Sequence, residues 1–104
     1  MDEIIDDISD KIFLENLKTE FKITVKDNVS KLSEFFESEN YSEIRRIAHD
    51  IKGVAGVFGF DKGTELAADL QKLTDNGDKI KIRNLLTELI GYLNKEVLEI
   101  KVEA

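Results

Sequence analysis

The clearest structural signal in this 104-residue chain lies in residues 44–60, IRRIAHDIKGVAGVFGF. Apolar residues recur there every three or four positions, the spacing that puts side chains on one face of an α-helix. They are Ile44, Ile47, Ile51, Ala55 and Phe58. His49 is the only histidine of the chain, and it projects roughly 165° away from the mean direction of that stripe. The spacing therefore predicts a helix that buries the stripe and exposes the imidazole.

The neighbours of the histidine on the outward face are cations and glycines. Arg45 and Arg46 lie one turn before it, Lys52 and Gly53 one turn after it, and Gly56 a further turn on. A glycine inside a helix costs about 1 kcal/mol relative to alanine. We therefore expect the glycines to serve a purpose other than helix formation, such as close approach of a partner.

The same helical spacing extends along the rest of the chain, which contains no proline. The predicted helices are a short one over Asp2–Ser9, a long one over Lys11–Glu37, the histidine-bearing one over Tyr41–Phe58, one that follows Asp61 and ends near Asn76, and a last one from Asp78 that continues through Ile100. Short connections make neighbouring helices antiparallel. The expected fold is all-α, a single domain over residues 1–104 that forms an antiparallel up-down four-helix bundle with a short N-terminal helix closing one end.

Boundary and core residues complete this expectation. The boundary signals are Asn40 with Glu43 as a capping box, Gly59 as a stop, Asp61 as an N-cap, Gly77 as a stop and Asp78 as an N-cap. The expected inward residues of the first two helices are Ile4, Ile5, Ile8, Leu14, Leu17, Phe21, Val25, Val29, Leu32 and Phe36. We expect all six phenylalanines, Phe13 and Phe35 included, to be core residues without a ligand-binding role.

Composition excludes several classes of function. The formal net charge of −7 repels phosphate backbones, so no nucleic-acid partner is expected. The chain has no cysteine and one histidine, which argues against disulfides, thiolate chemistry and metal sites. No apolar run approaches the ~20 residues of a membrane span, and the acidic start is unlike a signal peptide. We expect a cytoplasmic protein without metal or membrane association and, with no leftover apolar seam, a monomer.

The charge balance changes around the histidine. Residues 45–62 carry four cations against two anions, whereas the chain as a whole is acidic. A basic island on an acidic body favours docking to an acidic site on a partner. A solvated charged face without function would have the same composition, so charge alone leaves both interpretations open.

Residues 48–60 resemble the signature of histidine-containing phosphotransfer domains, in which lysine, glycine and a second glycine follow the histidine at three, four and ten positions. The matching residues here are His49, Lys52, Gly53 and Gly59. The version KGVAGVFGF is especially similar to the N-terminal phosphotransfer domain of CheA-type chemotaxis kinases. A departure is Val54-Ala55, where many phosphotransfer domains of hybrid kinases have small polar residues.

The resemblance also implies a side chain from the following helix, usually glutamate and in some members glutamine, that hydrogen-bonds the non-attacking ring nitrogen. The matching position is Gln71. Its amide carbonyl would fix the tautomer without adding charge, so we expect weaker activation than with glutamate. A solvent-facing glutamine without a role is the alternative.

The leading hypothesis is a phosphocarrier of a two-component phosphorelay rather than an enzyme. His49 would accept a phosphoryl group and exchange it with an aspartate of a response-regulator receiver domain, whose own Mg²⁺ would serve the reaction, so this chain needs no cofactor. Lys52, Arg45 and Arg46 would neutralise phosphoryl oxygens, and the glycines would leave room for the donor. No glycine-rich nucleotide loop is present, so the donor would be a histidine kinase, a hybrid kinase or the receiver.

Two rival hypotheses remain at this stage. In the first, the chain is a helical adaptor that binds a signalling protein without chemistry, and substitution of the histidine would leave binding intact. In the second, His49 is a general base, but no second titratable group at an obvious spacing completes such a mechanism.

Overall fold

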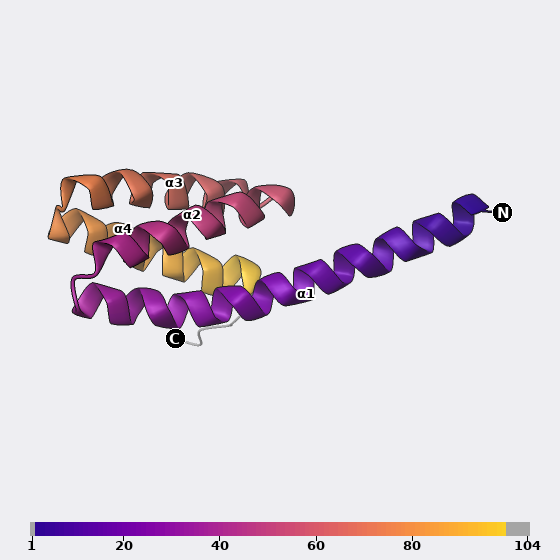
Figure 1. Cartoon of the computed structure of the whole chain (residues 1–104), viewed down its shortest axis with the longest axis horizontal. Coiled ribbons are helices and arrows are strands. Elements are labelled where there is room, and N and C mark those ends of the chain that lie inside the picture. The colour runs from indigo at the N-terminus through magenta and orange to yellow at the C-terminus, as the bar shows by residue number, and fades with distance from the viewer. Residues whose placement is uncertain (1, 100–104) are drawn as a thin grey trace.

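The protein is an all-α bundle (Figure 1). The structure, a computed structural model, describes residues 2–99, with side chains described from Asp10 onward. Its elements are α1 (Asp2–Glu37), α2 (Tyr41–Val57), α3 (Asp61–Asn76), α4 (Lys79–Tyr92) and the π-helical segment η1 (Leu93–Val97). Consecutive helices run antiparallel, and the described residues contain no strand. Within them, no helix is both long and apolar enough to cross a membrane.

The core is formed by aliphatic side chains from every element and one aromatic ring. Its buried members are Phe21, Val25, Leu32, Ile44, Ile47, Ala48, Ile51, Ala55, Leu66, Ala67, Leu70, Ile82, Leu86, Leu89, Leu93 and Val97. No polar or charged side chain is buried among the residues whose side chains are described. Burial of this apolar surface is therefore the main force that aligns the four helices.

The first helix differs from the prediction. A separate short helix over Asp2–Ser9 is wrong, because α1 continues without a break from Asp2 to Glu37. Neither proline nor glycine occurs before Gly53, so nothing in the sequence interrupts helical hydrogen bonding near Ser9. The predicted inward orientation of Ile4, Ile5 and Ile8 falls on side chains outside the described ones.

The N-terminal part of α1 projects beyond the other helices (Figure 1). At about 1.5 Å per residue, α1 is roughly 54 Å long and α2 roughly 26 Å, and the longest dimension of the molecule is 57 Å. The predicted burial of Leu14 and Phe13 is wrong, because these side chains are 51% and 62% exposed. The stripe on α1 is periodic throughout, but the bundle covers it only from Leu17 onward.

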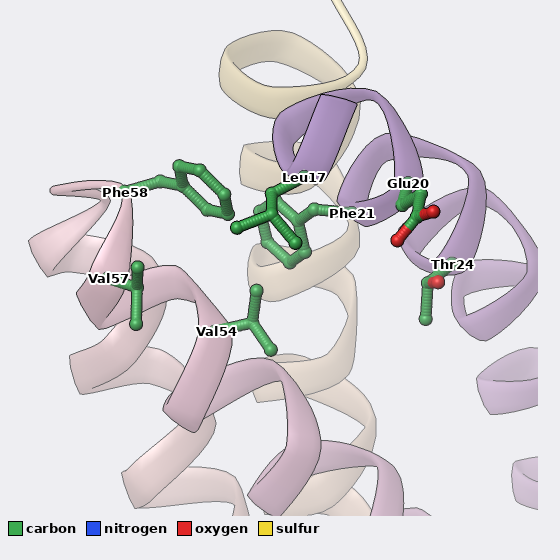
Figure 2. Close-up of a pocket in the computed structure, with 7 residues that line it drawn as sticks. All are labelled: Leu17, Glu20, Phe21, Thr24, Val54, Val57 and Phe58. Carbon is green, nitrogen blue, oxygen red and sulfur yellow. The ribbon is translucent and has the colours of Figure 1, made fainter. Parts of the chain in front are cut away.

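Where α1 enters the bundle, it meets the end of α2 across an apolar groove (Figure 2). The Phe21 ring stacks on Phe58, with ring centroids 5.5 Å apart, and lies 6.2 Å from the ring of Phe60. These aromatic contacts join α1 to the turn between α2 and α3, so they fix the position of the C-terminal end of α2.

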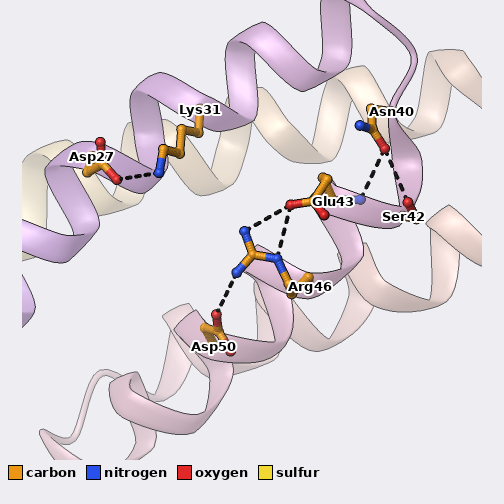
Figure 3. A network of polar contacts seen from close by, with 7 residues as sticks. All are labelled: Asp27, Lys31, Asn40, Ser42, Glu43, Arg46 and Asp50. Carbon is orange, nitrogen blue, oxygen red and sulfur yellow. Dashed lines mark hydrogen bonds and ion pairs between the residues drawn. The ribbon is translucent and has the colours of Figure 1, made fainter.

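The histidine-bearing helix begins at Tyr41, as predicted, and Figure 3 shows the capping contact of Asn40 with Glu43. Asn40 Oδ1 accepts a hydrogen bond from the Glu43 backbone N–H at 3.4 Å. The reciprocal half of a capping box is absent, because the Asn40 N–H donates to the Phe35 carbonyl at 2.8 Å. The helix ends at Val57, and Gly59 follows with φ +78°, a conformation that favours glycine.

Asp61 does not cap α3, contrary to the prediction. It is the first residue of that helix, and the capping position belongs to Phe60, which makes no side-chain capping bond. The later signals are confirmed: Gly77 is left-handed at the end of α3, and Asp78 Oδ1 accepts from the Lys81 N–H at 3.1 Å.

The last helix changes its winding near its C-terminal end. After Tyr92 the backbone adopts the π-helical segment η1, and the Leu98 N–H donates to the Leu93 carbonyl at 2.8 Å. The wider turn keeps both Leu93 and Val97 buried. The predicted continuation of the helix through Ile100 is wrong, because the described backbone leaves the helix after Val97; Ile100 itself lies outside the described residues.

Candidate functional site

His49 occupies the position that the helical spacing predicts. Its side chain is exposed, whereas the preceding Ala48 is fully buried. Because Ala48 and Ile47 anchor α2 in the core, the backbone beneath the imidazole is held rigidly. The ring is therefore accessible from solvent on a fixed support.

Gln71 of α3 lies beside the imidazole. Its Nε2 is 3.4 Å from His49 Nδ1, and its side chain is half-buried. Two helical turns further along the same pair of helices, a Cβ added to Gly56 of α2 would lie 3.6 Å from Thr64 Oγ1 of α3. Packing of α2 on α3 thus brings together two residues that are 22 positions apart.

The orientation of the Gln71 amide decides which ring nitrogen can attack. With Nε2 facing Nδ1, as in this structure, the amide N–H donates to the Nδ1 lone pair, and the ring proton must be on its Nε2. Rotation of the terminal amide by half a turn would bring its carbonyl oxygen to Nδ1–H and leave the outer nitrogen with a free lone pair. A glutamate carboxylate at this position would accept a hydrogen bond from Nδ1–H in either orientation. Glutamine can also donate an amide N–H to Nδ1, which a carboxylate cannot do.

A surface hollow of about 510 Å³ lies beside His49 and Gln71, and Ser42, Arg45 and Arg46 complete its lining. Sequence reasoning missed Ser42, although it precedes His49 by seven positions and therefore shares its helix face. Its hydroxyl is hydrogen-bonded to Asn40 Oδ1 at 3.1 Å. The hollow is large enough for a phosphoryl group and part of its donor.

The two arginines are already paired with carboxylates. Arg45 Nε lies 3.0 Å from Asp75 Oδ1 of α3. Arg46 binds Glu43 at 2.9 Å and Asp50 at 3.4 Å within α2 (Figure 3). The hydrogen bond and charge of Glu43, with a smaller contribution from Asp50, raise the pKa of Arg46 above its ordinary value.

These pairs modify the predicted basic island. Asp75 and Glu43 neutralise part of the positive charge, and sequence reasoning missed Asp75 because it belongs to another helix. All the participating side chains are at least 36% exposed. Exposed ion pairs contribute only about 0–1 kcal/mol each, so an incoming anion can take over either guanidinium.

Lys52 is exposed one turn after His49 but does not line the hollow. Among the described side chains, none lies within ion-pair distance of its ammonium group. The structure therefore places the two arginines and the lysine on different sides of the imidazole, with the lysine on a long flexible stem.

The glycines near His49 have separate explanations. Gly59 needs its positive φ. A Cβ on Gly53 would meet nothing within 4 Å, so no internal contact requires glycine there. The space outside Gly53 is open to a partner. By contrast, Gly63 on α3 has an internal reason, since its Cβ would lie 2.9 Å from the Tyr92 ring.

The model of the Hpt domain family matches residues 16–100, and the chain belongs to this family. Membership gives it a histidine phosphotransfer role in a two-component phosphorelay, with kinases and receiver domains as the classes of partner. No curated protein and no solved structure matches the chain. Among the described residues, no group of three His, Cys, Asp or Glu side chains is placed to hold a metal ion.

Proposed function

We propose that His49 is the phosphoacceptor and that it exchanges a phosphoryl group with an aspartate of a receiver domain. The observation that carries this proposal is the exposed imidazole held through Nδ1 by Gln71 at 3.4 Å, beside a hollow lined by two arginines. An exposed nucleophile, an orienting group and cations for the phosphoryl oxygens are the parts that phosphoryl transfer requires.

The reaction starts from the tautomer with Nδ1–H, which requires the Gln71 amide to rotate by half a turn so that its carbonyl oxygen, rather than the Nε2 seen facing the ring, lies against Nδ1. The lone pair of His49 Nε2 attacks phosphorus of the partner's aspartyl phosphate, a nitrogen–phosphorus bond forms, and the phosphorus–oxygen bond breaks with its electrons left on the aspartate. The ring becomes cationic and keeps the proton on Nδ1, which donates a hydrogen bond to the Gln71 carbonyl oxygen. Lys52 and the arginines offset the charge of the phosphoryl oxygens.

The donor and the metal belong to the partner in this proposal. The phosphoryl group reaches His49 from a histidine kinase, from a hybrid kinase or from the aspartyl phosphate of a receiver domain. The Mg²⁺ that aspartyl-phosphate chemistry needs is held in the receiver's acidic pocket. That pocket complements the arginines and Lys52. We accordingly place the chain in the cytoplasm, acting as a phosphoprotein without an ATP site of its own.

The test is phosphoryl transfer to the purified chain from a phosphorylated receiver and from a CheA-type kinase domain. Wild type is expected to acquire acid-labile, alkali-stable label, and His49→Ala is expected to acquire none. The matched control is Ile80→Ala, which removes an exposed apolar side chain on α4 and is expected to label normally. A wild-type chain that binds these partners but takes no label would favour the adaptor hypothesis.

A further inference from the structure

Two side-chain contacts join α2 to α3 beside the histidine, one helical turn apart. Gln71 Nε2 lies 3.4 Å from His49 Nδ1, and Asp75 Oδ1 lies 3.0 Å from Arg45 Nε. Arg45 precedes His49 by four positions, and Asp75 follows Gln71 by four, so the two residues on each helix are surface neighbours. A cation one turn from the imidazole is therefore held by a carboxylate of the neighbouring helix.

The two arginines that line the hollow are bound differently. Arg46 donates hydrogen bonds to Glu43 from Nε at 3.0 Å and from Nη2 at 2.9 Å, and to Asp50 from Nη1 at 3.4 Å (Figure 3). Among the described residues, Arg45 has one ion-pair partner, Asp75, and its guanidinium makes no hydrogen bond of good geometry to that carboxylate or to another described group. Of the two cations, Arg45 is thus the one that a new anion can take over with the smaller loss.

The Arg45 guanidinium borders the hollow beside the reactive ring. Arg45 and His49 both line this hollow, whereas Asp75 does not, so the carboxylate holds the cation from outside it. A phosphoryl group carries about 1.5–2 negative charges near pH 7, against one on a carboxylate. Side chains four positions apart on a helix have Cβ atoms only about 5–6 Å apart. Charge and distance therefore both favour a phosphoryl group on His49 over Asp75 as the partner of Arg45.

We propose that Asp75 holds Arg45 only while His49 is unphosphorylated, and that phosphorylation moves the guanidinium from the Asp75 carboxylate to the phosphoryl oxygens. Phosphorylation of His49 is itself the proposed function, on which this exchange depends. Asp75 then acts as a regulator, because its ion pair with Arg45 must break before the cation can serve the phosphoryl group. Since phosphoryl exchange with a receiver is reversible in the proposed relay, Asp75 lowers the share of the phosphoryl group that the chain holds at equilibrium.

The equilibrium of phosphoryl exchange with a phosphorylated receiver tests the proposal. Asp75→Asn removes the competing charge and is expected to shift this equilibrium toward the phosphorylated chain by about two- to fivefold, the range that one exposed ion pair allows. Asp27→Asn is the matched control. Its side chain is likewise 60% exposed and lies 3.0 Å from its partner, Lys31, but it belongs to α1, which contributes no lining residue to the hollow. It removes the same charge and is expected to leave the equilibrium unchanged.

A double-mutant cycle separates the exchange from direct repulsion between Asp75 and the phosphoryl group. Arg45→Gln is expected to shift the equilibrium away from the phosphorylated chain. Asp75→Asn added to Arg45→Gln is expected to have no further effect, because no guanidinium is left to exchange. The proposal is overturned by an effect of Asp75→Asn that is the same with and without Arg45, or by equal shifts in Asp75→Asn and Asp27→Asn. Far-ultraviolet circular dichroism checks that the variants remain helical.

Phosphorus NMR of the phosphorylated chain observes the exchange directly. Potassium phosphoramidate is the donor: His49 Nε2 attacks its phosphorus, and the phosphorus–nitrogen bond of the reagent breaks with its electrons left on ammonia. A guanidinium beside the phosphoryl group favours the dianion. The phosphoryl pKa is therefore expected to be lower in wild type than in Arg45→Gln, and lowest in Asp75→Asn.

The outcomes of the NMR experiment distinguish the exchange from the proposed function. Equal phosphoryl pKa values in wild type, Arg45→Gln and Asp75→Asn overturn the exchange and leave His49 as the phosphoacceptor. Absence of label on His49 with phosphoramidate, receiver and kinase alike is a different result, which overturns the proposed function and the exchange together.

Discussion

On the α3 side of α2, the exposed side chains are His49 and Arg45, and they meet Gln71 and Asp75 of the neighbouring helix. On the α1 side, Val54 and Val57 face an apolar groove instead. Both surfaces are built on 17 residues. The buried stripe between them anchors α2 in the core, so one short helix carries a candidate phosphotransfer site on one side and an apolar groove on the other.

The largest expected effect is on phosphoryl acceptance, which depends on the α3 side of α2 and not on the α1 side. His49→Ala removes the nucleophile and is expected to abolish phosphoryl acceptance, while Val57→Glu is expected to leave the rate per histidine unchanged. Single-turnover transfer from a phosphorylated receiver measures both. A comparable loss in folded Val57→Glu would mean that the groove belongs to the phosphotransfer surface.

Substitution of Gln71, on the α3 side of α2, tests whether its side chain orients the His49 imidazole. Gln71→Ala leaves Nδ1 without its partner and is expected to slow transfer by about 10–100-fold, the range seen when a group that orients a histidine is lost. Gln71→Glu can only accept from Nδ1–H and is expected to exceed the wild-type rate. Rapid-quench kinetics would contradict the orienting role if glutamate were slower than alanine.

Alanine substitutions at Gly53 and Gly63 compare a position where an added Cβ meets open space with one where it meets a neighbouring side chain. Gly53→Ala is expected to stabilise the protein by about 0.5–1 kcal/mol, because its Cβ meets nothing, yet slow transfer by obstructing the partner. Gly63→Ala is expected to destabilise by about 1 kcal/mol, since its Cβ would collide with Tyr92. Urea unfolding measures both free energies. A Gly53→Ala variant with unchanged transfer kinetics would show that partners do not approach closely there.

The smallest expected effect concerns the ion pair at the edge of the hollow. Asp75→Asn releases Arg45, and the exposed pair contributes at most about 1 kcal/mol to stability. Transfer is expected to become modestly faster, because the guanidinium no longer exchanges one anion for another. A slower variant at low salt would indicate that Asp75 positions Arg45 instead.

Local sequence predicted the parts of the site that belong to one helix. The start of α2 at Tyr41, the outward direction of His49 and the stop at Gly59 follow from spacing, capping and backbone freedom within a few residues. The family resemblance added Gln71, a position that periodicity alone placed only at the border of its stripe. The role of each residue in transfer stays a prediction.

The sequence by itself determined the helical class, the boundaries at Tyr41, Gly77 and Asp78 and the exposure of the histidine, because these depend on interactions between neighbours three or four positions apart. Only the tertiary structure decided that Phe13 and Leu14 lie beyond the bundle, that Asp75 pairs with Arg45 and that the Gln71 amide reaches Nδ1. Periodicity shows which face of a helix is apolar, but the lengths and positions of the other helices decide how much of that face is covered.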